Sequence, residues 1–243
     1  MKTLSAASVR QSIWKLATAM PPILWLVAIC VTVGTDLLDF LEAPVKGVRP
    51  GPGFVVAAII RVMLVFALSY FVIRRMANVD RPYRLRPGFV RYVLFTLAMA
   101  ALFGLLLRLV TLLGADRSSM AAEWMLMLVT MTGWSLLTIR LTAWSAGLAV
   151  DRPIRELPAY WRALAGNSIP LGVALLQIVT PFSAIHSALT LVAVRIPLAG
   201  KGLAALALID GVVSTIQLMF TMALSVVAWR LADERLRDRG LRA

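Results

Sequence analysis

Long apolar stretches, separated by short polar segments, constrain the fold of this chain more than any other feature. Six of them cover about residues 16–34, 53–73, 89–113, 123–148, 168–194 and 203–230. A helix needs about 20 apolar residues to cross the hydrocarbon core of a bilayer, and these stretches reach that length or exceed it. The sequence therefore predicts an all-α fold, a polytopic transmembrane bundle of about six helices with short interfacial helices.

The composition agrees with a single integral membrane domain over residues 1–243. Hydrophobic residues make up 60% of the chain and charged residues 15%, and the charges cluster between the apolar stretches. Such a composition is rare in soluble proteins. The net charge of +13 does not indicate a nucleic-acid partner, because the basic residues flank apolar stretches and no zinc-finger, helix-turn-helix or RNA-binding pattern is present. We expect membrane lipids as the partners.

The distribution of Lys and Arg predicts the orientation. Of 25 basic residues, 17 lie in the N-terminal segment, the second and fourth connections and the C-terminal segment, whereas 5 lie in the other three connections. Positive charge in short segments marks the cytoplasmic side of a membrane. Six crossings satisfy this alternation and place both termini in the cytoplasm.

Two polar segments next to the spans are expected to form short helices. Pro21 and Pro22 lie near the start of the first stretch, where they allow an interfacial helix over residues 4–19 to be separate from the span. Residues 151–167 predict an amphipathic helix with Leu157, Tyr160, Trp161 and Leu164 on one face, at the level of the lipid headgroups. This second helix is either an aromatic anchor or a docking surface for a partner.

Two further features concern the ends and bends of the spans. Asp36, Asp39 and Glu42 are assigned to the first outer loop, which precedes a Pro/Gly-rich break. Pro170 and Pro181 are expected to bend the fifth span.

Ionisable residues inside the apolar stretches are the candidates for function, because burying them in a bilayer is costly. Arg61, Arg108, His186 and Asp210 come from four different stretches. A rise of about 1.5 Å per residue places all four roughly 8–13 Å below the outer boundary of the membrane. We expect a buried polar cluster there, in which Asp210 pairs with Arg61 or Arg108.

A polar stripe follows Asp210 along the last stretch. Its members Ser214, Gln217, Thr221 and Ser225 share one helical face, which is expected to point into the bundle. The stripe either lines a water-filled path from the outer cluster to the cytoplasm or makes hydrogen bonds between helices. His186 likewise either relays protons or forms a hydrogen-bonded helix contact.

Arg140 lies apart from this cluster, in the cytoplasmic half of the fourth stretch. It could extend to the membrane surface or stack on Trp144. Alternatively it could bind a lipid phosphate, because a guanidinium group binds phosphate oxygens in bidentate fashion.

The sequence lacks the signatures of common catalytic sites. It contains no G-x-S-x-G, H-E-x-x-H or Walker motif, and it has one cysteine, Cys30, and one histidine. Asp210 and His186 are the only candidate dyad within the spans. We therefore expect no enzymatic activity, no cofactor and no metal site.

One stretch resembles a known family. Residues 140–171 run from Arg140 through Val150 to Pro153 and Trp161 to Asn167 into the next span. This pattern of helix, polar loop and Trp-Arg helix is similar to that of six-helix bacterial membrane proteins, including the membrane domain attached to some glycerophosphodiester phosphodiesterases. The resemblance implies a helical bundle in the bacterial inner membrane, and it implies no reaction, substrate or site residue.

Two functional hypotheses follow from the sequence. The first is a non-enzymatic inner-membrane protein whose polar interior serves structure, lipid contact or partner assembly. The alternative is a small transporter or channel with a polar site in the outer half of the membrane, built from the cluster of Arg61, Arg108, His186 and Asp210.

Overall fold

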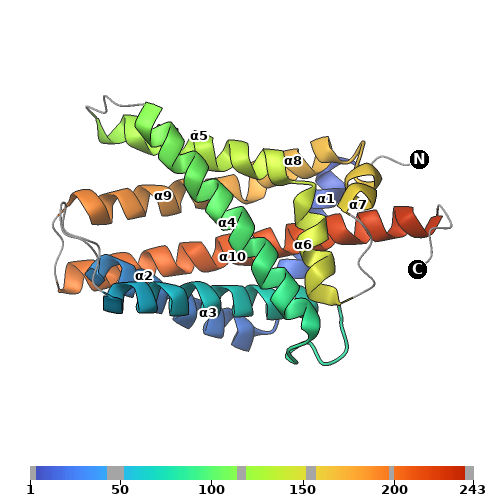
Figure 1. Ribbon diagram of the computed structural model, residues 1–243, viewed down its shortest axis with the longest axis horizontal. Coiled ribbons are helices and arrows are strands. Elements are labelled where there is room, and N and C mark those ends of the chain that lie inside the picture. Colours follow the sequence, from blue (N-terminus) through green and yellow to red (C-terminus); the bar gives the residue numbers. More distant parts are fainter. Residues whose placement is uncertain (1–3, 43–51, 114–118, 152–156, 197–199, 239–243) are drawn as a thin grey trace.

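The computed structural model describes residues 4–42, 52–113, 119–151, 157–196 and 200–238. Within these ranges the chain forms ten helices and no strand, which confirms the all-α prediction (Figure 1). The helices are α1 (Ala6–Thr18), α2 (Pro22–Glu42), α3 (Pro52–Met76), α4 (Pro87–Leu113), α5 (Met120–Thr138), α6 (Leu141–Val150), α7 (Leu157–Ala163), α8 (Ser168–Ile178), α9 (Thr180–Arg195) and α10 (Lys201–Asp238).

Helix length and composition support membrane crossing for some of these elements. Two helices are long and apolar enough to cross a membrane, namely α4 over Pro87–Val110 and α10. Three bent pairs also qualify if each pair is one span: α1 with α2, α5 with α6, and α8 with α9. The described residues thus supply up to five spans. The remaining predicted stretch, 53–73, lies in α3, which is not among the spans found within the described residues.

Two of the three breaks within the bent pairs have a local cause, a proline at or next to the break. The prolines at 21 and 22 end α1 and begin α2 at a bend of 88°, as the sequence predicted. A bend of 45° separates α8 from α9, next to Pro181 in the first turn of α9. Pro170 lies in the first turn of α8, where proline is tolerated, and it causes no bend. The predicted bend of the fifth span therefore comes from one of its two prolines.

Two predicted boundaries were wrong. The predicted fourth span, 123–148, is broken at Arg140 by a bend of 67° between α5 and α6. The first span continues to Glu42, so Asp36 and Asp39 belong to α2 and not to an outer loop. Leu37, Leu38, Phe40 and Leu41 sustain the helix past Gly34, and an acidic pair on its own does not end a helix.

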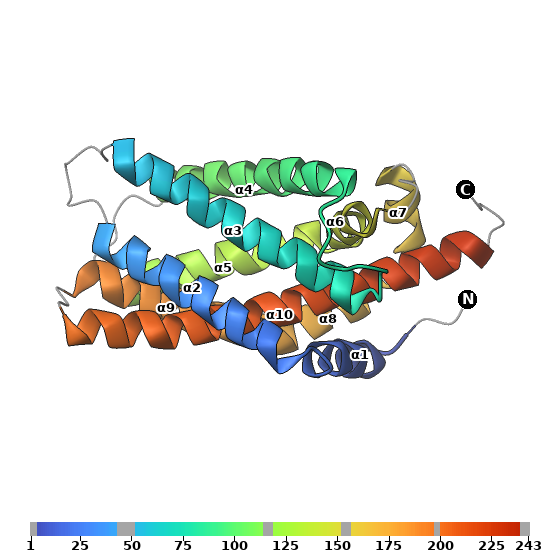
Figure 2. The same ribbon diagram turned by 90° about the horizontal axis from the view of Figure 1, so that it is seen from below.

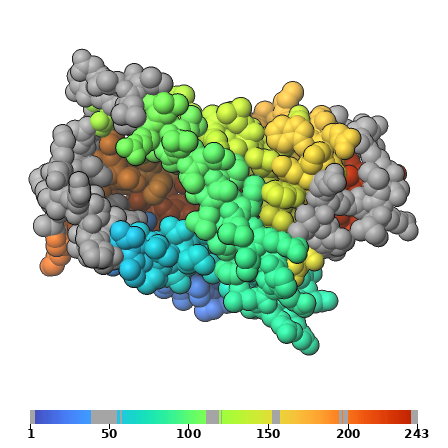
Figure 3. All heavy atoms as spheres, viewed as in Figure 1, coloured from blue at the N-terminus to red at the C-terminus, as the bar shows by residue number. Residues whose placement is uncertain are grey.

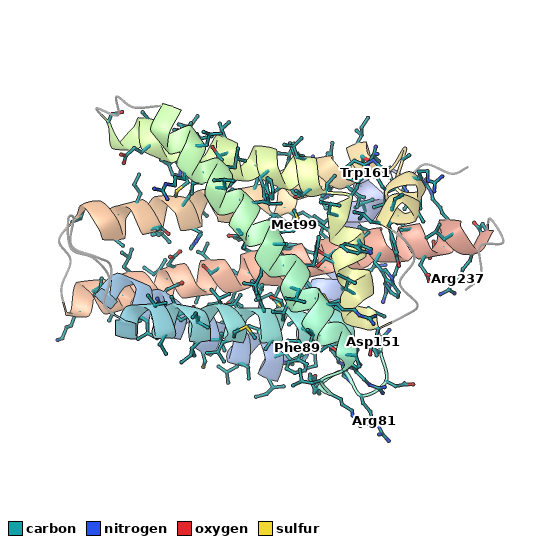
Figure 4. All side chains as sticks on the ribbon, in the orientation of Figure 1. Arg81, Phe89, Met99, Asp151, Trp161 and Arg237 are labelled. Carbon is teal, nitrogen blue, oxygen red and sulfur yellow. The ribbon has the colours of Figure 1, made fainter. Side chains whose placement is uncertain are left out.

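The ends of the helices lie at two opposite ends of the bundle. Both termini lie at one end together with the turn from α3 to α4, whereas α2, α4 and α9 end at the other (Figure 1). Arg81 and Arg237 lie at the end with the termini (Figure 4). This arrangement matches the alternation of basic-rich and basic-poor segments along the chain.

Helix α10 runs along the centre of the bundle. It packs against α1, α2, α3, α6, α7, α8 and α9. Figure 2 shows α3 and α4 on one side of the molecule and α8, α9 and α10 on the other. The short helix α1 buries Val9, Ile13 and Ala17, which are spaced four residues apart, against this framework.

The closest helix contact joins α2 to α10. The Thr32 hydroxyl of α2 lies 2.7 Å from the Gly211 carbonyl oxygen and 2.7 Å from the Thr215 hydroxyl of α10. A Cβ atom at position 211 would lie 2.6 Å from the Cα atom of Val33 and 2.7 Å from its nitrogen. The two backbones can approach this closely only because residue 211 is a glycine.

Arginine side chains tie the helix ends together at the end with the termini. Arg74 is buried and donates from Nη1 to the Ala149 carbonyl oxygen (3.1 Å) near the end of α6 and from Nε to the Pro82 carbonyl oxygen (3.2 Å). Arg230 donates to the Met76 carbonyl oxygen at the end of α3 (2.7 Å). The last carbonyls of a helix lack partners within the helix, so these guanidinium groups satisfy them and complement the helix dipole.

Substituting the glycine of the α2–α10 contact should weaken the bundle. Gly211→Ala places a methyl group against the backbone of Val33, so the helices must separate, which should cost about 1–3 kcal/mol. Gly104→Ala is the matched control, since nothing lies within 4 Å of a Cβ there and alanine favours a helix. Thermal unfolding in detergent should show a lower Tm for the 211 variant only, and equal Tm values for both variants would contradict this account of the contact.

Replacing the buried Arg74 should lower the stability of the fold more than replacing its neighbour Arg75. Arg74→Lys removes the forked geometry that reaches two carbonyl oxygens, so about 1.5–3 kcal/mol of stability should be lost. Arg75→Lys is the control, because Arg75 is exposed. Denaturant or thermal unfolding of the two variants measures the difference. A Tm for Arg74→Lys within a degree or two of wild type would argue against the role of Arg74.

Candidate functional site

A histidine–aspartate pair joins α9 to α10 inside the bundle. The His186 Nδ1 atom lies 2.7 Å from Asp210 Oδ1 and 3.1 Å from the Ser214 hydroxyl oxygen. The Asp210 side chain is 1% exposed and the His186 side chain 31% exposed. Because α9 and α10 are consecutive helices that pack side by side, His186 near the middle of α9 can face Asp210 in the first half of α10. Asp210 and Ser214 are one helical turn apart and present both oxygens to one imidazole.

The geometry of the pair matches a proton-binding site. With a proton on Nδ1, the imidazole donates to the carboxylate of Asp210, and this bond persists when the ring is neutral or charged. Asp210 Oδ2 is buried and has no hydrogen-bond partner among the described residues. A buried carboxylate oxygen without a donor is costly, so the pair gains stability from any further proton or donor that reaches it.

The other predicted members of the outer cluster lie elsewhere. Asp210 bonds His186 and neither arginine, so the predicted Arg–Asp pair is wrong. Arg108 is exposed on α4, which packs against α3, α5 and α6. Residues at the same depth in a membrane need not face one another, because each helix can be rotated about its own axis. Arg108 lies on the side of α4 that points away from the bundle.

Arg61 is buried, although not against Asp210. Its side chain is 6% exposed and lines a groove of about 560 Å³ between α2 and α3, together with apolar residues such as Leu26 and Leu64. Asp36 lies in α2, one of the two helices that form this groove. Sequence reasoning missed Asp36 because it assigned this residue to a loop. The helix-forming residues up to Glu42 are the signal that could have placed it.

The polar stripe on α10 lies inside the bundle, as expected. Ser214 belongs to the site, and the Gln217 side-chain oxygen is buried without a hydrogen-bond partner in the described part of the chain. Thr221 and Ser225 line a cavity of about 170 Å³ between α4, α5, α6 and α10. The stripe thus runs from the pair to this cavity. Met99, which also lines the cavity, lies near the middle of the bundle (Figure 4).

Arg140 lies at the break between α5 and α6. Its Nε atom donates to the Ser168 hydroxyl (2.6 Å), and its guanidinium carbon lies 4.9 Å above the centre of the Trp161 ring. The predicted stacking on Trp144 is wrong, since Trp144 packs edge-on against Phe95. The helix predicted over residues 151–167 is present as the shorter α7, and residues 152–156 lie outside the described residues. Tyr160 is buried, and Trp161 is exposed beneath Arg140. Binding of a lipid phosphate by Arg140 stays a prediction.

The outer surface of the bundle is hollowed beside the helices that carry the pair. Figure 3 shows a hollow between α3 on one side and α4 and α5 on the other, with α9 and α10 at its floor. These two helices are therefore reachable from outside the bundle at this face. The described residues contain no group of three or more His, Cys, Asp or Glu side chains that could hold a metal ion.

Comparison of the chain with family models, curated proteins and solved structures gave no match. The resemblance of residues 140–171 to six-helix bacterial membrane proteins therefore stays an expectation. The argument for function rests on the geometry of the site.

The pair can be observed directly, because His186 is the only histidine of the chain. In protein labelled with ¹⁵N-histidine and purified through a tag without histidine, one imidazole gives the whole signal. We expect a hydrogen-bonded Nδ1–H whose resonance shifts in Asp210→Asn, because the charged acceptor is lost. Arg108→Gln should leave the signal unchanged. An identical imidazole spectrum in wild type and Asp210→Asn would disprove the pair.

Proposed function

We propose that the chain crosses the inner membrane of a bacterium six times, with both termini in the cytoplasm. The two helices and three bent pairs that meet the length and hydropathy criterion support this topology, if each bent pair is one span and α3 is the sixth. Its 25 residues give a helix about 37 Å long, enough for a hydrocarbon core about 30 Å thick. The basic residues gathered at the end with the termini support a cytoplasmic location for that end.

We further propose that the protein is not an enzyme and works as a small transporter that binds a proton at the His186–Asp210 pair. One observation carries this proposal: a carboxylate that is 1% exposed and hydrogen-bonded to the only histidine of the chain, inside an apolar bundle. Ionisable pairs of this kind are costly in a membrane and characteristic of proton relays. Ser214 adds a hydroxyl oxygen that can accept from the same Nδ1–H.

A scaffold that contacts lipids is the second candidate. It is supported by the groove between α2 and α3, which is almost entirely apolar and about 560 Å³ in volume. Such a groove suits an acyl chain, and the buried Arg61 at its wall suits a polar headgroup. In this case the His186–Asp210 pair would serve only to hold α9 against α10.

Proton flux into proteoliposomes distinguishes the two candidates. Wild-type protein should dissipate an imposed pH gradient, measured with an entrapped pH-sensitive dye. Asp210→Asn should lower the rate by at least about tenfold, because an amide of the same size cannot bind the transported proton. Arg108→Gln, which removes an exposed charge outside the pair, should retain the wild-type rate.

The unfolding temperature of each variant tests the second candidate, in which the pair only stabilises the fold. If Asp210→Asn keeps the wild-type Tm and loses flux, the transporter proposal holds. If wild-type vesicles show no more flux than empty ones, and Asp210→Asn only unfolds at a lower temperature, the pair is structural and the proposal fails.

A further inference from the structure

A small cavity in the cytoplasmic half of the bundle carries an unusual number of hydroxyl groups. It has a volume of about 170 Å³ and lies where α4 and the α5–α6 break pack over α10. Six of its lining residues are Ser or Thr, namely Thr96, Thr138, Thr142, Ser145, Thr221 and Ser225. The other six lining residues, Tyr92, Phe95, Met99, Trp134, Leu141 and Met222, make most of the wall apolar, so the hydroxyl groups are the places where a polar occupant can bind.

The hydrogen bonds of these hydroxyl groups define which occupant fits. Five of the six donate to a backbone carbonyl oxygen of their own helix, from Thr96 to Tyr92 and likewise from Thr138, Thr142, Thr221 and Ser225, at 2.7 to 2.9 Å. The protons of these five hydroxyl groups are thus engaged, and their oxygen lone pairs are left for the cavity. These oxygens can accept from hydrogen-bond donors, and water is the smallest of these. At roughly 30 Å³ per molecule the cavity has room for several waters.

The same face of α10 connects the cavity to the His186–Asp210 pair. From Asp210 the face continues through Ser214 and Gln217 to Thr221 and Ser225. Gln217, halfway along, holds a buried side-chain oxygen with no partner among the residues described. Fifteen residues of helix correspond to about 22 Å, which is most of the distance from the outer half of a membrane to its inner surface.

We propose that this face of α10 and the cavity form a hydrated half-channel, through which protons pass between the His186–Asp210 pair and the cytoplasm. The waters donate to the hydroxyl oxygens of the cavity and to Gln217, and the proton moves along the waters. The identity of the transported ion rests on the proposed function. The presence of water in the cavity rests on the hydroxyl groups alone.

Cysteine accessibility tests the water-filled cavity. In a Cys30→Ala background, which removes the only native thiol, Thr221→Cys and Ser225→Cys are compared with Val226→Cys. Val226 is fully buried on another face of the same helix turn. The probe is 2-aminoethyl methanethiosulfonate, applied to inverted membrane vesicles. Only a hydrated thiol ionises and reacts readily, so positions 221 and 225 should react at least about tenfold faster than position 226. Equal rates at all three positions would overturn the half-channel.

Flux measurements separate this inference from the proposed function. Thr221→Val and Ser225→Ala each remove a hydroxyl oxygen that accepts hydrogen bonds. Vesicles with either variant should conduct protons several-fold more slowly than wild-type vesicles, with the Tm unchanged. If wild type conducts protons but these variants conduct equally well, the half-channel is wrong and the transporter stands. If positions 221 and 225 react quickly but wild type conducts no protons, the cavity is hydrated, while the proton path and the proposed function both fail.

Discussion

Every polar group within an apolar bundle must find its hydrogen-bond partner inside the protein, and the structure follows from this constraint. The backbone groups are satisfied within helices, which excludes other secondary structure from the interior. At the helix ends, where carbonyl oxygens lack partners, Arg74 and Arg230 supply the donors. In the middle of the bundle, Thr32 lies against the carbonyl oxygen of Gly211 and the hydroxyl of Thr215. Arginine side chains therefore help to close the ends of the bundle.

The same constraint distinguishes the His186–Asp210 pair from the other polar contacts. Most buried hydroxyl groups donate to a carbonyl oxygen of their own helix, so their protons are satisfied without a partner from another helix. Asp210 has no such local solution. Its carboxylate is satisfied on one oxygen by a residue from the neighbouring helix, and its second oxygen is buried without a partner among the described residues. A group that is incompletely satisfied at this depth is the natural place for function to reside.

The helix breaks have a structural role that complements this chemistry. Because of the 67° bend at Arg140, α6 does not continue along the axis of α5 and instead packs across α4 and α10. The hydroxyl-lined cavity lies at this crossing, because helices that cross at an angle leave space that parallel helices would fill. The arginine at the break is held by Ser168 and Trp161, so the bend is supported from α7 and α8.

The sequence by itself determined the helical architecture, the alternation of the two ends, the separate helices α1 and α7 and the inward polar face of α10. These depend on local composition and on the helical period, which can be read along one chain. Only the tertiary structure decided that Asp210 meets His186 and that Arg108 faces outward, because the rotation of each helix about its axis is set by packing against its neighbours. The break at Arg140 also lay beyond the sequence, since no proline or glycine marks it. It depends on contacts with residues more than twenty positions away, which exist only in the folded bundle.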